Sequence, residues 1–394
     1  MDRPLLNRRL AEFGTTIFAE MSALAVRTGA INLGQGFPDA DGPEEVREAA
    51  VRALRDGRGN QYPPGPGIPE LRTAVAAHQE RHYGHLGLSC DPDTEVLVTA
   101  GATEAIAASM LALLEPGDEV IALEPYYDSY AATIAMAGGR RVPVTLRAHP
   151  ESGSYCLDLD ELRDAVTDDT RLILLNTPHN PTGTVLTRDE LAAVAELAVE
   201  RDLLVITDEV YEHLVFEGEH LPLASFPGMR ERTVTISSAG KTFSFTGWKV
   251  GWVTGPAELV GAVRSAKQFL TYVSAGPFQY AVAEALALPD AYYAGLRDDL
   301  RTKRDVLAAG LTDAGLRVFR PSGTYFITTD IRPLGESDGF AFCRALPERA
   351  GVVAIPNAVF YDHKEQGAPF VRFAFCKSVA VLEEAAGRLK ALTA

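Results

Sequence analysis

Short apolar runs alternate with longer amphipathic segments through the middle of the chain. The apolar runs predict strands at residues 96–99, 119–123, 141–146, 172–176, 203–208, 234–237 and 250–254. The segments between and after them predict helices at residues 103–114, 129–137, 159–166, 188–201 and 258–272. Strands that are apolar throughout and alternate with helices are typical of a mainly parallel sheet covered on both faces. We therefore expect an α/β fold whose functional residues gather at the carboxyl ends of the strands.

The last quarter of the chain has a different pattern. A segment rich in arginine and aspartate predicts a long connecting helix at residues 291–314. Apolar runs after it predict strands at 325–330, 352–355 and 371–375, and a final helix at 382–392. This order predicts a smaller α+β domain. We expect an N-terminal arm and part of this small domain in residues 1–45, a large domain in 46–288, and the C-terminal small domain in 289–394.

Composition and charge narrow the class of protein. Of the 394 residues, 46% are hydrophobic and 23% are charged, which is ordinary for a globular protein. The net charge of −16 disfavours nucleic acid and anionic membranes as partners, so any anion site must be built locally. Four cysteines without a CxxC pair indicate neither a metal site nor a disulfide framework. With no apolar leader or membrane-length run, we expect a cytoplasmic protein with reduced thiols and no metal.

One segment rich in small and hydroxyl residues carries the strongest chemical signal. It reads SSAGKTFSFTGWKVGW over residues 237–252 and contains Lys241 and Lys249. A buried amine can form a Schiff base with an aldehyde, and a nearby cation can hold a phosphate. Pyridoxal phosphate (PLP) offers both groups. The competing interpretation, an exposed loop lysine, is disfavoured by the glycine, serine and tryptophan around it.

Two turns that follow predicted strands offer further polar groups. Residues 101–105 (GATEA) open a helix with small residues, which leaves backbone N–H groups free for a phosphate. Taken alone, that motif is better explained as a plain strand-to-helix turn. Residues 176–183 (NTPHNPTG) form a loop fixed by two prolines and a glycine, from which Asn180 could donate its amide to a phenolate. An asparagine that caps its own turn explains that loop equally well.

A carboxylate also ends one of the predicted buried strands. Asp208 follows the apolar run at residues 203–206, where an unpaired charge would be very costly. A protonated pyridine nitrogen would be a suitable partner, and Tyr211 could reach the same ring from another side. The alternative role for Asp208 is that of a helix N-cap.

These four motifs, in this order and spacing, resemble the class I and II aminotransferases of PLP fold type I. The resemblance covers nearly the whole chain and includes NLGQGFPD at 32–39, NQYPP at 60–64 and SGTYF at 322–326. It is closest to the branch that holds kynurenine and glutamine aminotransferases and actinobacterial N-succinyldiaminopimelate aminotransferases. It implies a mainly parallel seven-stranded sheet flanked by helices, plus a smaller α+β domain.

The resemblance also implies roles around the cofactor. Lys241 would form the Schiff base and move the substrate α-proton, and Asp208 would pair with the pyridine nitrogen. Asn180 and Tyr211 would bond the phenolic oxygen. The other cofactor contacts would be the stacking ring of Tyr127, the phosphate ligands Ser238, Lys249, Ala102 and Thr103, and Tyr62 reaching the phosphate of a partner subunit.

A second group of roles concerns the substrate. Arg372 would clamp the α-carboxylate with its planar guanidinium, completed by Gly36 and Asn180, and Phe18 would lie near the side chain. Each residue has a simpler alternative role, such as a core aromatic for Tyr127 or half of an ion pair for Arg372. All these alternatives would have to hold together against the order of the motifs.

The implied function is transfer of an amino group from an amino acid to a 2-oxo acid such as 2-oxoglutarate, by ping-pong kinetics in a homodimer with shared active sites. The closest resemblance favours N-succinyldiaminopimelate as donor, in lysine biosynthesis. Residues 271–278 (TYVSAGPF), near the substrate by the same resemblance, contain no basic residue, which disfavours a second carboxylate site there unless Arg27 or another arginine supplies one.

Other functions use the same residues or the same fold. A kynurenine, glutamine and methionine aminotransferase of broad specificity and a cysteine-conjugate β-lyase both remain open alternatives. The settings of NLGQGFPD and Arg372 disfavour a carbon–carbon-forming or ring-forming synthase. A regulator with an added DNA-binding module is disfavoured because only about thirty residues precede NLGQGFPD and the chain is acidic.

Overall fold

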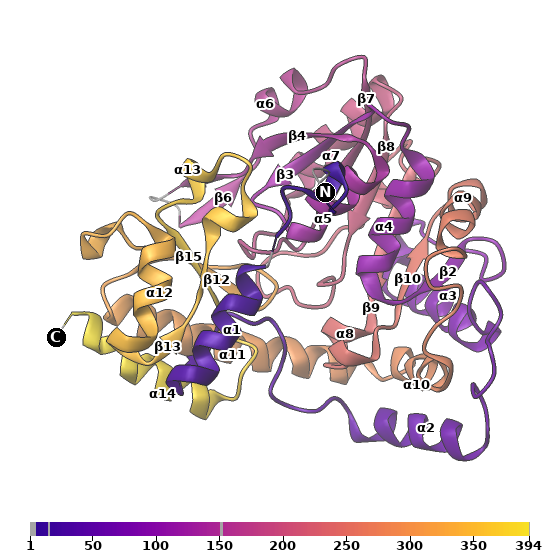
Figure 1. The fold of residues 1–394 in the computed structure, drawn as a ribbon. Coiled ribbons are helices and arrows are strands. Elements are labelled where there is room, and N and C mark those ends of the chain that lie inside the picture. The colour runs from indigo at the N-terminus through magenta and orange to yellow at the C-terminus, as the bar shows by residue number, and fades with distance from the viewer. Residues whose placement is uncertain (1–4, 15, 150–152, 394) are drawn as a thin grey trace.

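Seven strands from the middle of the chain form one sheet in the order β2-β10-β9-β8-β7-β3-β4 (Figure 1). The structure is a computed structural model that describes residues 5–14, 16–149 and 153–393. The strands are β2 (Val96–Thr99), β3 (Glu119–Glu124), β4 (Arg140–Thr145), β7 (Thr170–Asn176), β8 (Leu204–Asp208), β9 (Thr233–Ser238) and β10 (Gly251–Thr254). Only β10 runs antiparallel to its neighbours, β2 and β9. The predicted mainly parallel seven-stranded sheet is therefore confirmed.

Alternate residues of the sheet pack against helices on opposite faces. Leu172 and Leu174 of β7 join one apolar cluster, whereas Ile173 and Leu175 join another. The first cluster is completed by α4 (Gly101–Leu113), α5 (Asp128–Ala137) and α9 (Ala257–Lys267), and the second by α6 (Leu159–Asp164) and α7 (Arg188–Glu200). A third cluster packs α2 (Glu44–Arg55), α3 (Pro69–Tyr83) and α10 (Gly276–Leu286) against the β2 edge. Because strand residues alternate between faces, burial on both sides explains why these runs are apolar throughout.

The helix predicted at residues 258–272 is shorter than the sequence pattern indicates. It ends at Lys267, and Tyr272 has a positive φ of 63°. The Nζ atom of Lys267 donates to the carbonyl oxygens of Tyr272 at 2.6 Å and Gly65 at 3.3 Å. This buried lysine therefore bonds one carbonyl oxygen of the turn that follows α9 and one from a distant segment.

The smaller part of the chain is built on a four-stranded antiparallel sheet in the order β11-β12-β15-β14. Its strands are β11 (Arg317–Phe319), β12 (Phe326–Asp330), β15 (Phe370–Ala374) and β14 (Ile355–Pro356). Helices α1 (Ile17–Thr28), α11 (Asp290–Asp313), α12 (Gly339–Ala350) and α14 (Val379–Leu389) share one apolar cluster with it. The α/β class with a smaller α+β part is confirmed, whereas the division at residues 45 and 288 stays a prediction.

The strand predicted at residues 352–355 is divided between two sheets. β13 (Val352–Val353) pairs in parallel with β1 (Ile31–Asn32), whereas β14 pairs with β15. Ala354 lies between the two short strands and is fully buried. A continuous apolar run cannot show which strand each of its residues pairs with. The sequence pattern therefore predicted one strand where the structure has two. The pairing also places residues just before Gly36 against the C-terminal part of the chain.

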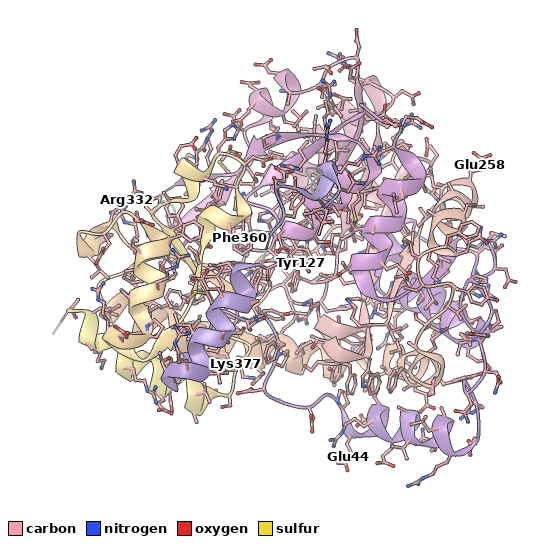
Figure 2. The ribbon with its side chains drawn as sticks, in the orientation of Figure 1. Glu44, Tyr127, Glu258, Arg332, Phe360 and Lys377 are labelled. Atoms are coloured by element: carbon pink, nitrogen blue, oxygen red, sulfur yellow. The ribbon has the colours of Figure 1, made fainter. Side chains whose placement is uncertain are left out.

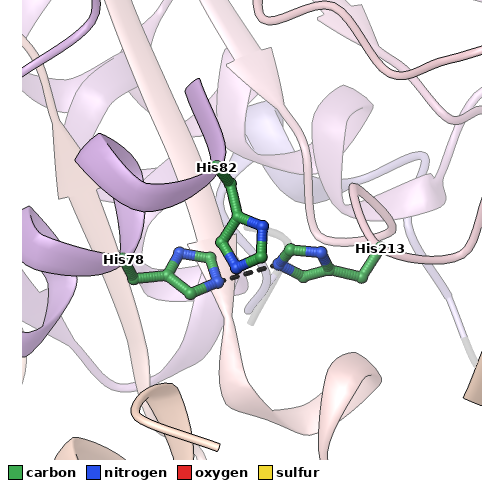
Figure 3. Close-up of side chains that lie close together, drawn as sticks. All are labelled: His78, His82 and His213. Carbon is green, nitrogen blue, oxygen red and sulfur yellow. Dashed lines mark hydrogen bonds between the residues drawn. The ribbon is translucent and has the colours of Figure 1, made fainter. Parts of the chain in front are cut away.

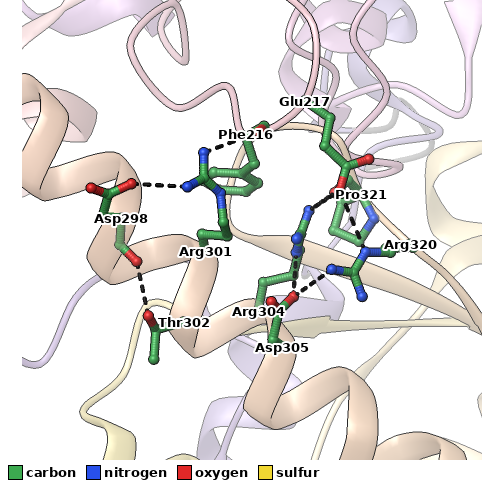
Figure 4. A network of polar contacts seen from close by, with 9 residues as sticks. All are labelled: Phe216, Glu217, Asp298, Arg301, Thr302, Arg304, Asp305, Arg320 and Pro321. Carbon is green, nitrogen blue, oxygen red and sulfur yellow. Dashed lines mark hydrogen bonds and ion pairs between the residues drawn. The ribbon is translucent and has the colours of Figure 1, made fainter.

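A buried arginine ties α11 to both parts of the molecule. Arg304 donates from Nη1 to Glu217 Oε1 and to the carbonyl oxygen of Pro321, each at 3.0 Å, and from Nε to Asp305 Oδ1 at 2.8 Å (Figure 4). Only 1% of Arg304 is exposed. A buried guanidinium must be paired, so these bonds hold α11 to the segment after β8 and to the approach to β12.

The remaining elements are short. They include β5 (Arg147–His149), β6 (Ser154–Cys156), α8 (Ala239–Thr242) and α13 (Lys364–Gly367), together with several 3₁₀ turns. Among the described helices, none has the length and apolar character needed to cross a membrane. All four cysteines are free thiols.

Candidate active site

A cavity of about 420 Å³ is lined by residues of both the large sheet and the smaller part of the chain. The carboxyl ends of β7, β8 and β9 contribute Asn176, Asp208 and Ser238, as expected of a parallel sheet. Tyr127 lines the cavity beside Phe360 of the smaller part (Figure 2). The two parts touch there through a hydrogen bond of 2.8 Å from the Tyr126 amide to the Phe360 carbonyl oxygen. A cavity of this size suits a small-molecule ligand.

All but one of the predicted site residues line this cavity. They are Phe18, Gly36, Ala102, Thr103, Tyr127, Asn180, Asp208, Tyr211, Ser238, Lys241, Lys249 and Arg372. Tyr62 lies outside the cavity, with 82% of its surface exposed and its ring 5.6 Å from that of Tyr272. The proposed role of Tyr62 needs a second subunit and stays a prediction, as do the individual roles of the other residues.

Lys241 places a buried amine in the cavity. It lies in the single helical turn α8 that follows β9. Burial lowers the pKa of its amine to about 8. Its Nζ lies 5.7 Å from the ring centres of Tyr211 and of Tyr325. An amine with a pKa near neutrality can act both as a nucleophile and as a proton acceptor.

A carboxylate faces the same cavity at the end of β8. Burial raises the pKa of Asp208 to about 6, although a hydrogen bond from Tyr130 opposes the shift. The Tyr130 hydroxyl donates to Asp208 Oδ2 at 2.6 Å. Val210 donates its amide to Oδ1 at a longer 3.4 Å. No helix begins at Asp208, so its alternative role as an N-cap is not observed.

Tyr130 is a site residue that the sequence analysis missed. It lies three residues after Tyr127, on the same side of α5, and both rings reach the cavity. The two rings meet edge to face at 5.8 Å. The spacing of the two tyrosines was the available signal, but it does not show which of them faces a carboxylate.

Replacing Tyr130 with phenylalanine should raise the acid limit of ligand binding, which is the pH below which ligand affinity falls. A hydrogen bond to a charged group contributes about 1.5–3 kcal/mol, and one pKa unit corresponds to about 1.4 kcal/mol. Without the Tyr130 hydroxyl, the Asp208 pKa should rise by about one unit or more. The protonated carboxyl cannot pair with a cation. If the PLP that the sequence resemblance implies is the ligand, its affinity measured against pH should begin to fall at a pH higher by about one unit.

Tyr83→Phe is the matched control for that variant. The Tyr83 hydroxyl also donates to a carboxylate, Glu212 Oε2 at 2.7 Å, but Tyr83 does not line the cavity. Removing it should leave the pH dependence of PLP affinity unchanged. An unchanged acid limit in Tyr130→Phe would show that Tyr130 does not control the ionisation of Asp208.

An anion site is built where α4 begins. Gly101 has a positive φ of 74°, and a Cβ there would lie 3.2 Å from Lys249 Nζ. A Cβ on Gly251 would lie 2.7 Å from the Gly101 carbonyl carbon, so only glycine permits this approach of β10 to α4. Ser238 lies beside them at the end of β9. The free N–H groups of a helix start, an ammonium and a hydroxyl together suit a phosphate.

A buried guanidinium lies at the other end of the cavity. Arg372 Nη1 donates to Asn180 Oδ1 and Nη2 donates to the Gly34 carbonyl oxygen, both at 2.9 Å. Its Nε has no protein partner. Burial lowers the pKa of Arg372 to about 10, which leaves it charged at neutral pH. The unpaired Nε–H and the charge suit a carboxylate ligand.

Aromatic rings enclose this guanidinium. Its central carbon lies 4.1 Å from the ring centre of Phe326 and 5.4 Å from that of Phe18. Gly36 lies against the Phe326 ring, since a Cβ on Gly36 would approach Phe326 Cζ to 2.5 Å. The Tyr325 hydroxyl donates to the Gly36 carbonyl oxygen at 2.7 Å. These contacts fix the wall of the cavity and exclude water from one side of the guanidinium.

Comparisons with known proteins agree with this geometry. Residues 28–389 match the family described as aminotransferase class I and II. The chain is 56% identical over 393 residues to a Mycobacterium tuberculosis (strain CDC 1551 / Oshkosh) protein described as "Probable N-succinyldiaminopimelate aminotransferase DapC", and the match covers 98% of each chain. It is 40% identical to the methionine aminotransferase of Escherichia coli (strain K12), over 99% of this chain and 100% of that one.

The fold has similar neighbours among solved structures. The structure of N-succinyldiaminopimelate aminotransferase from Mycobacterium tuberculosis superimposes with a TM-score of 0.95 at 57% identity. The superposition covers 98% of this chain and 100% of that one. Similarity at this level extends through both sheets and the cavity between them.

Proposed function

The chain belongs to the class I and II aminotransferases, and from this premise we propose that it uses PLP and takes N-succinyldiaminopimelate as its amino donor. It moves an amino group from an amino acid to a 2-oxo acid. The identity of 56% over 98% of both chains to a protein described as acting on this donor is the observation that carries the proposal.

The cavity residues fit PLP at each of its functional groups. The phosphate would bind Ser238, Lys249 and the first amides of α4, Ala102 and Thr103. The ring nitrogen would face Asp208, whose buried carboxylate needs a positive partner. When bound, PLP supplies an aldehyde that condenses with amines and a ring that draws electrons from the substrate α-carbon.

Other side chains of the cavity would hold that ring in place. Tyr127 would lie against its face, and the Asn180 amide nitrogen remains available for a phenolic oxygen because Oδ1 is bonded to Arg372. The Tyr211 hydroxyl would approach the same oxygen. Burial raises the pKa of Tyr211, so this hydroxyl keeps its proton and can donate it.

Different side chains of the cavity bind the substrate and transfer its proton. Arg372 binds the α-carboxylate through Nε–H and one remaining terminal N–H, which orients the substrate by a planar two-bond contact. Lys241 Nζ accepts the proton from the substrate α-carbon and returns it during transfer, a role that suits its pKa of about 8. Asp208 keeps a proton on the ring nitrogen.

We propose that the active enzyme is a homodimer. Tyr62 and Tyr272, whose rings are in contact, are exposed by 82% and 51%, and Phe269, three residues before Tyr272, is exposed by 84%. Large aromatic groups exposed together are typical of an interaction surface. A second subunit on this surface would bury them and bring its Tyr62 to the phosphate.

The distal carboxylate of a succinylated donor needs its own partner. Among the described residues that line the cavity, the cationic side chains are Lys241, Lys249 and Arg372, and each already has an assigned task. The distal carboxylate would therefore bind hydroxyl and amide donors near Thr16 and Gln35, or groups of the second subunit. This arrangement is compatible with the lack of a basic residue in 271–278.

A half-reaction absorbance assay tests the donor. PLP-loaded enzyme is mixed singly with N-succinyldiaminopimelate, kynurenine, glutamine, methionine and glutamate, and conversion of the cofactor from its aldehyde to its amine form is followed. Unsuccinylated diaminopimelate is the matched control. We expect the succinylated donor to react at least about tenfold faster than this control, a difference of about 1.4 kcal/mol.

Other results would identify the alternatives. Rapid reaction with kynurenine, glutamine and methionine, without preference for the succinylated donor, would indicate an aminotransferase of broad specificity. Release of pyruvate and a thiol from a cysteine conjugate, without conversion by any donor, would indicate a β-lyase.

A further inference from the structure

Three histidines bring their ring nitrogens together outside the catalytic cavity. His78 and His82 are one helical turn apart on α3, and His213 lies in the turn after β8. One ligand nitrogen from each lies within 4.8 Å of the others. Figure 3 shows the three rings converging, with a nitrogen of His82 pointing toward the bond between the other two. Residues four apart on a helix present their side chains to one point.

Burial acts on the pKa of all three rings in the same direction. Burial lowers the pKa of His78 to about 3 and holds the pKa of His213 well below its usual value. Burial also lowers the pKa of His82. All three rings are therefore neutral at physiological pH. Neutral imidazole is the form that ligates metals, so binding would displace no proton from a charged ring.

Hydrogen bonding among the three rings leaves one buried ring nitrogen without a hydrogen-bond partner. His78 Nε2 and His213 Nε2 lie 2.8 Å apart and form one hydrogen bond. His82 Nε2 is buried and has no protein partner. A buried polar nitrogen without a partner costs about 1–3 kcal/mol. A cluster that served packing alone would be more stable with an apolar residue at this position.

We propose that His78, His82 and His213 bind one divalent transition-metal ion, with Zn²⁺ as the best-suited ion. Zinc–nitrogen bonds of about 2.0–2.1 Å place the ligand nitrogens about 3.4 Å apart in a tetrahedral site. To ligate the ion, His78 and His213 must separate by about half an ångström and His82 must approach them. One of the two hydrogen-bonded Nε2 atoms carries a proton, so that ring must bind as the tautomer protonated at Nδ1. The three nitrogens leave a fourth position for water.

The charged groups around the cluster act in both directions. The Glu212 carboxylate favours positive charge at His78 and His82, whereas the Arg81 guanidinium opposes it. Glu212 is held by hydrogen bonds from Tyr83 at 2.7 Å and Ser237 at 2.6 Å. Tyr293 covers the cluster, with its ring centre 4.5 Å from that of His213. A nearby carboxylate offsets part of the ion's charge without occupying a coordination position.

The site would connect α3 to the catalytic turn. His213 follows Tyr211 by two residues, and the Leu214 amide donates to the Tyr211 carbonyl oxygen at 2.8 Å. An ion shared by α3 and His213 therefore limits movement of the turn that presents Tyr211 to the cavity. The role proposed for the ion is structural, since none of its ligands lines the cavity.

A Co²⁺ titration of the chelator-treated, PLP-loaded enzyme tests the proposal. Tetrahedral Co²⁺ has visible ligand-field bands of high intensity, and we expect them to saturate at one equivalent per chain. Added Zn²⁺ should displace the bound Co²⁺, abolish its bands and raise the Tm by a few degrees. In His82→Ala, where the side chain is only half-buried and folding should survive, the bands and the Tm rise should be lost.

His85→Ala is the matched control, because His85 follows α3 but lies outside the cluster. It should bind Co²⁺ as the wild type does. Absence of saturable binding at one equivalent in the wild type would overturn the proposal. Equal binding by His82→Ala and the wild type, or loss of binding in His85→Ala alone, would also overturn it.

Discussion

Replacing Lys241 with alanine is expected to abolish transamination while PLP stays bound. The change leaves the proposed phosphate ligands and Asp208 in place, so PLP should be held there without its covalent link. The substrate α-proton loses its acceptor, because no other described amine lines the cavity except Lys249 at the phosphate site. General acid–base catalysis contributes about 10²- to 10⁴-fold, and we expect a loss of turnover of that size. Single-turnover absorbance with the best donor measures it.

Two controls separate this chemistry from general damage. Lys303→Ala removes a lysine that pairs with Asp299 at 2.7 Å on α11, and it should retain turnover. A small added amine should partly restore proton transfer in Lys241→Ala, because it can enter the space left by the side chain. Undiminished transamination by Lys241→Ala would disprove the assignment of Lys241.

The second large effect is expected from Arg372→Lys. This change keeps a positive charge but removes the planar fork, so the α-carboxylate keeps one contact in place of two. A charge-assisted hydrogen bond contributes about 1.5–3 kcal/mol, which corresponds to a fall in kcat/KM of about 10- to 100-fold. Steady-state kinetics should show the rise in KM for both the amino acid and the 2-oxo acid.

Substrate chemistry provides the sharpest check on that role. An amine donor without an α-carboxylate should react equally slowly with the wild type and with Arg372→Lys. Arg304→Lys is the matched control, since Arg304 is also buried and paired but does not line the cavity. It should lower the Tm without a change in KM. A loss of kcat/KM that is the same for carboxylate and non-carboxylate donors would exclude the clamp.

The sequence predicted the large sheet well because its strands are buried on both faces. Runs such as 172–176 stay apolar at every position, and this leaves little ambiguity about the element. The errors arose where tertiary contacts decide the outcome. Helix α9 ends at Lys267, whose Nζ binds carbonyl oxygens beyond the helix, and the pairing of β13 with β1 divides one apolar run between two sheets.

The candidate site could be predicted as far as its residues lie in recognisable motifs. Asp208 ends β8, and Lys241 and Asn180 come shortly after β9 and β7, so their place at one edge of the sheet follows from topology. Tyr130 lies inside a helix with no motif around it, and only its distance to Asp208 reveals a role. The histidine cluster was also missed, because His78 and His213 are 135 positions apart and the cysteine pattern gave no sign of a metal.

The contacts around Arg372 have a consequence for synthesis on the ribosome. Its hydrogen bond to Gly34 joins residues 338 positions apart, and Ala374 donates its amide to the Leu33 carbonyl oxygen nearby. At about 5–20 residues per second, translation leaves Gly34 without this partner for roughly 20 to 70 s. A nascent chain can complete its central sheet in that interval, but it cannot bind a substrate carboxylate until its final strand emerges. On the proposed role of Arg372, catalytic competence is thus acquired only after β15 has been synthesised, not gradually along the chain.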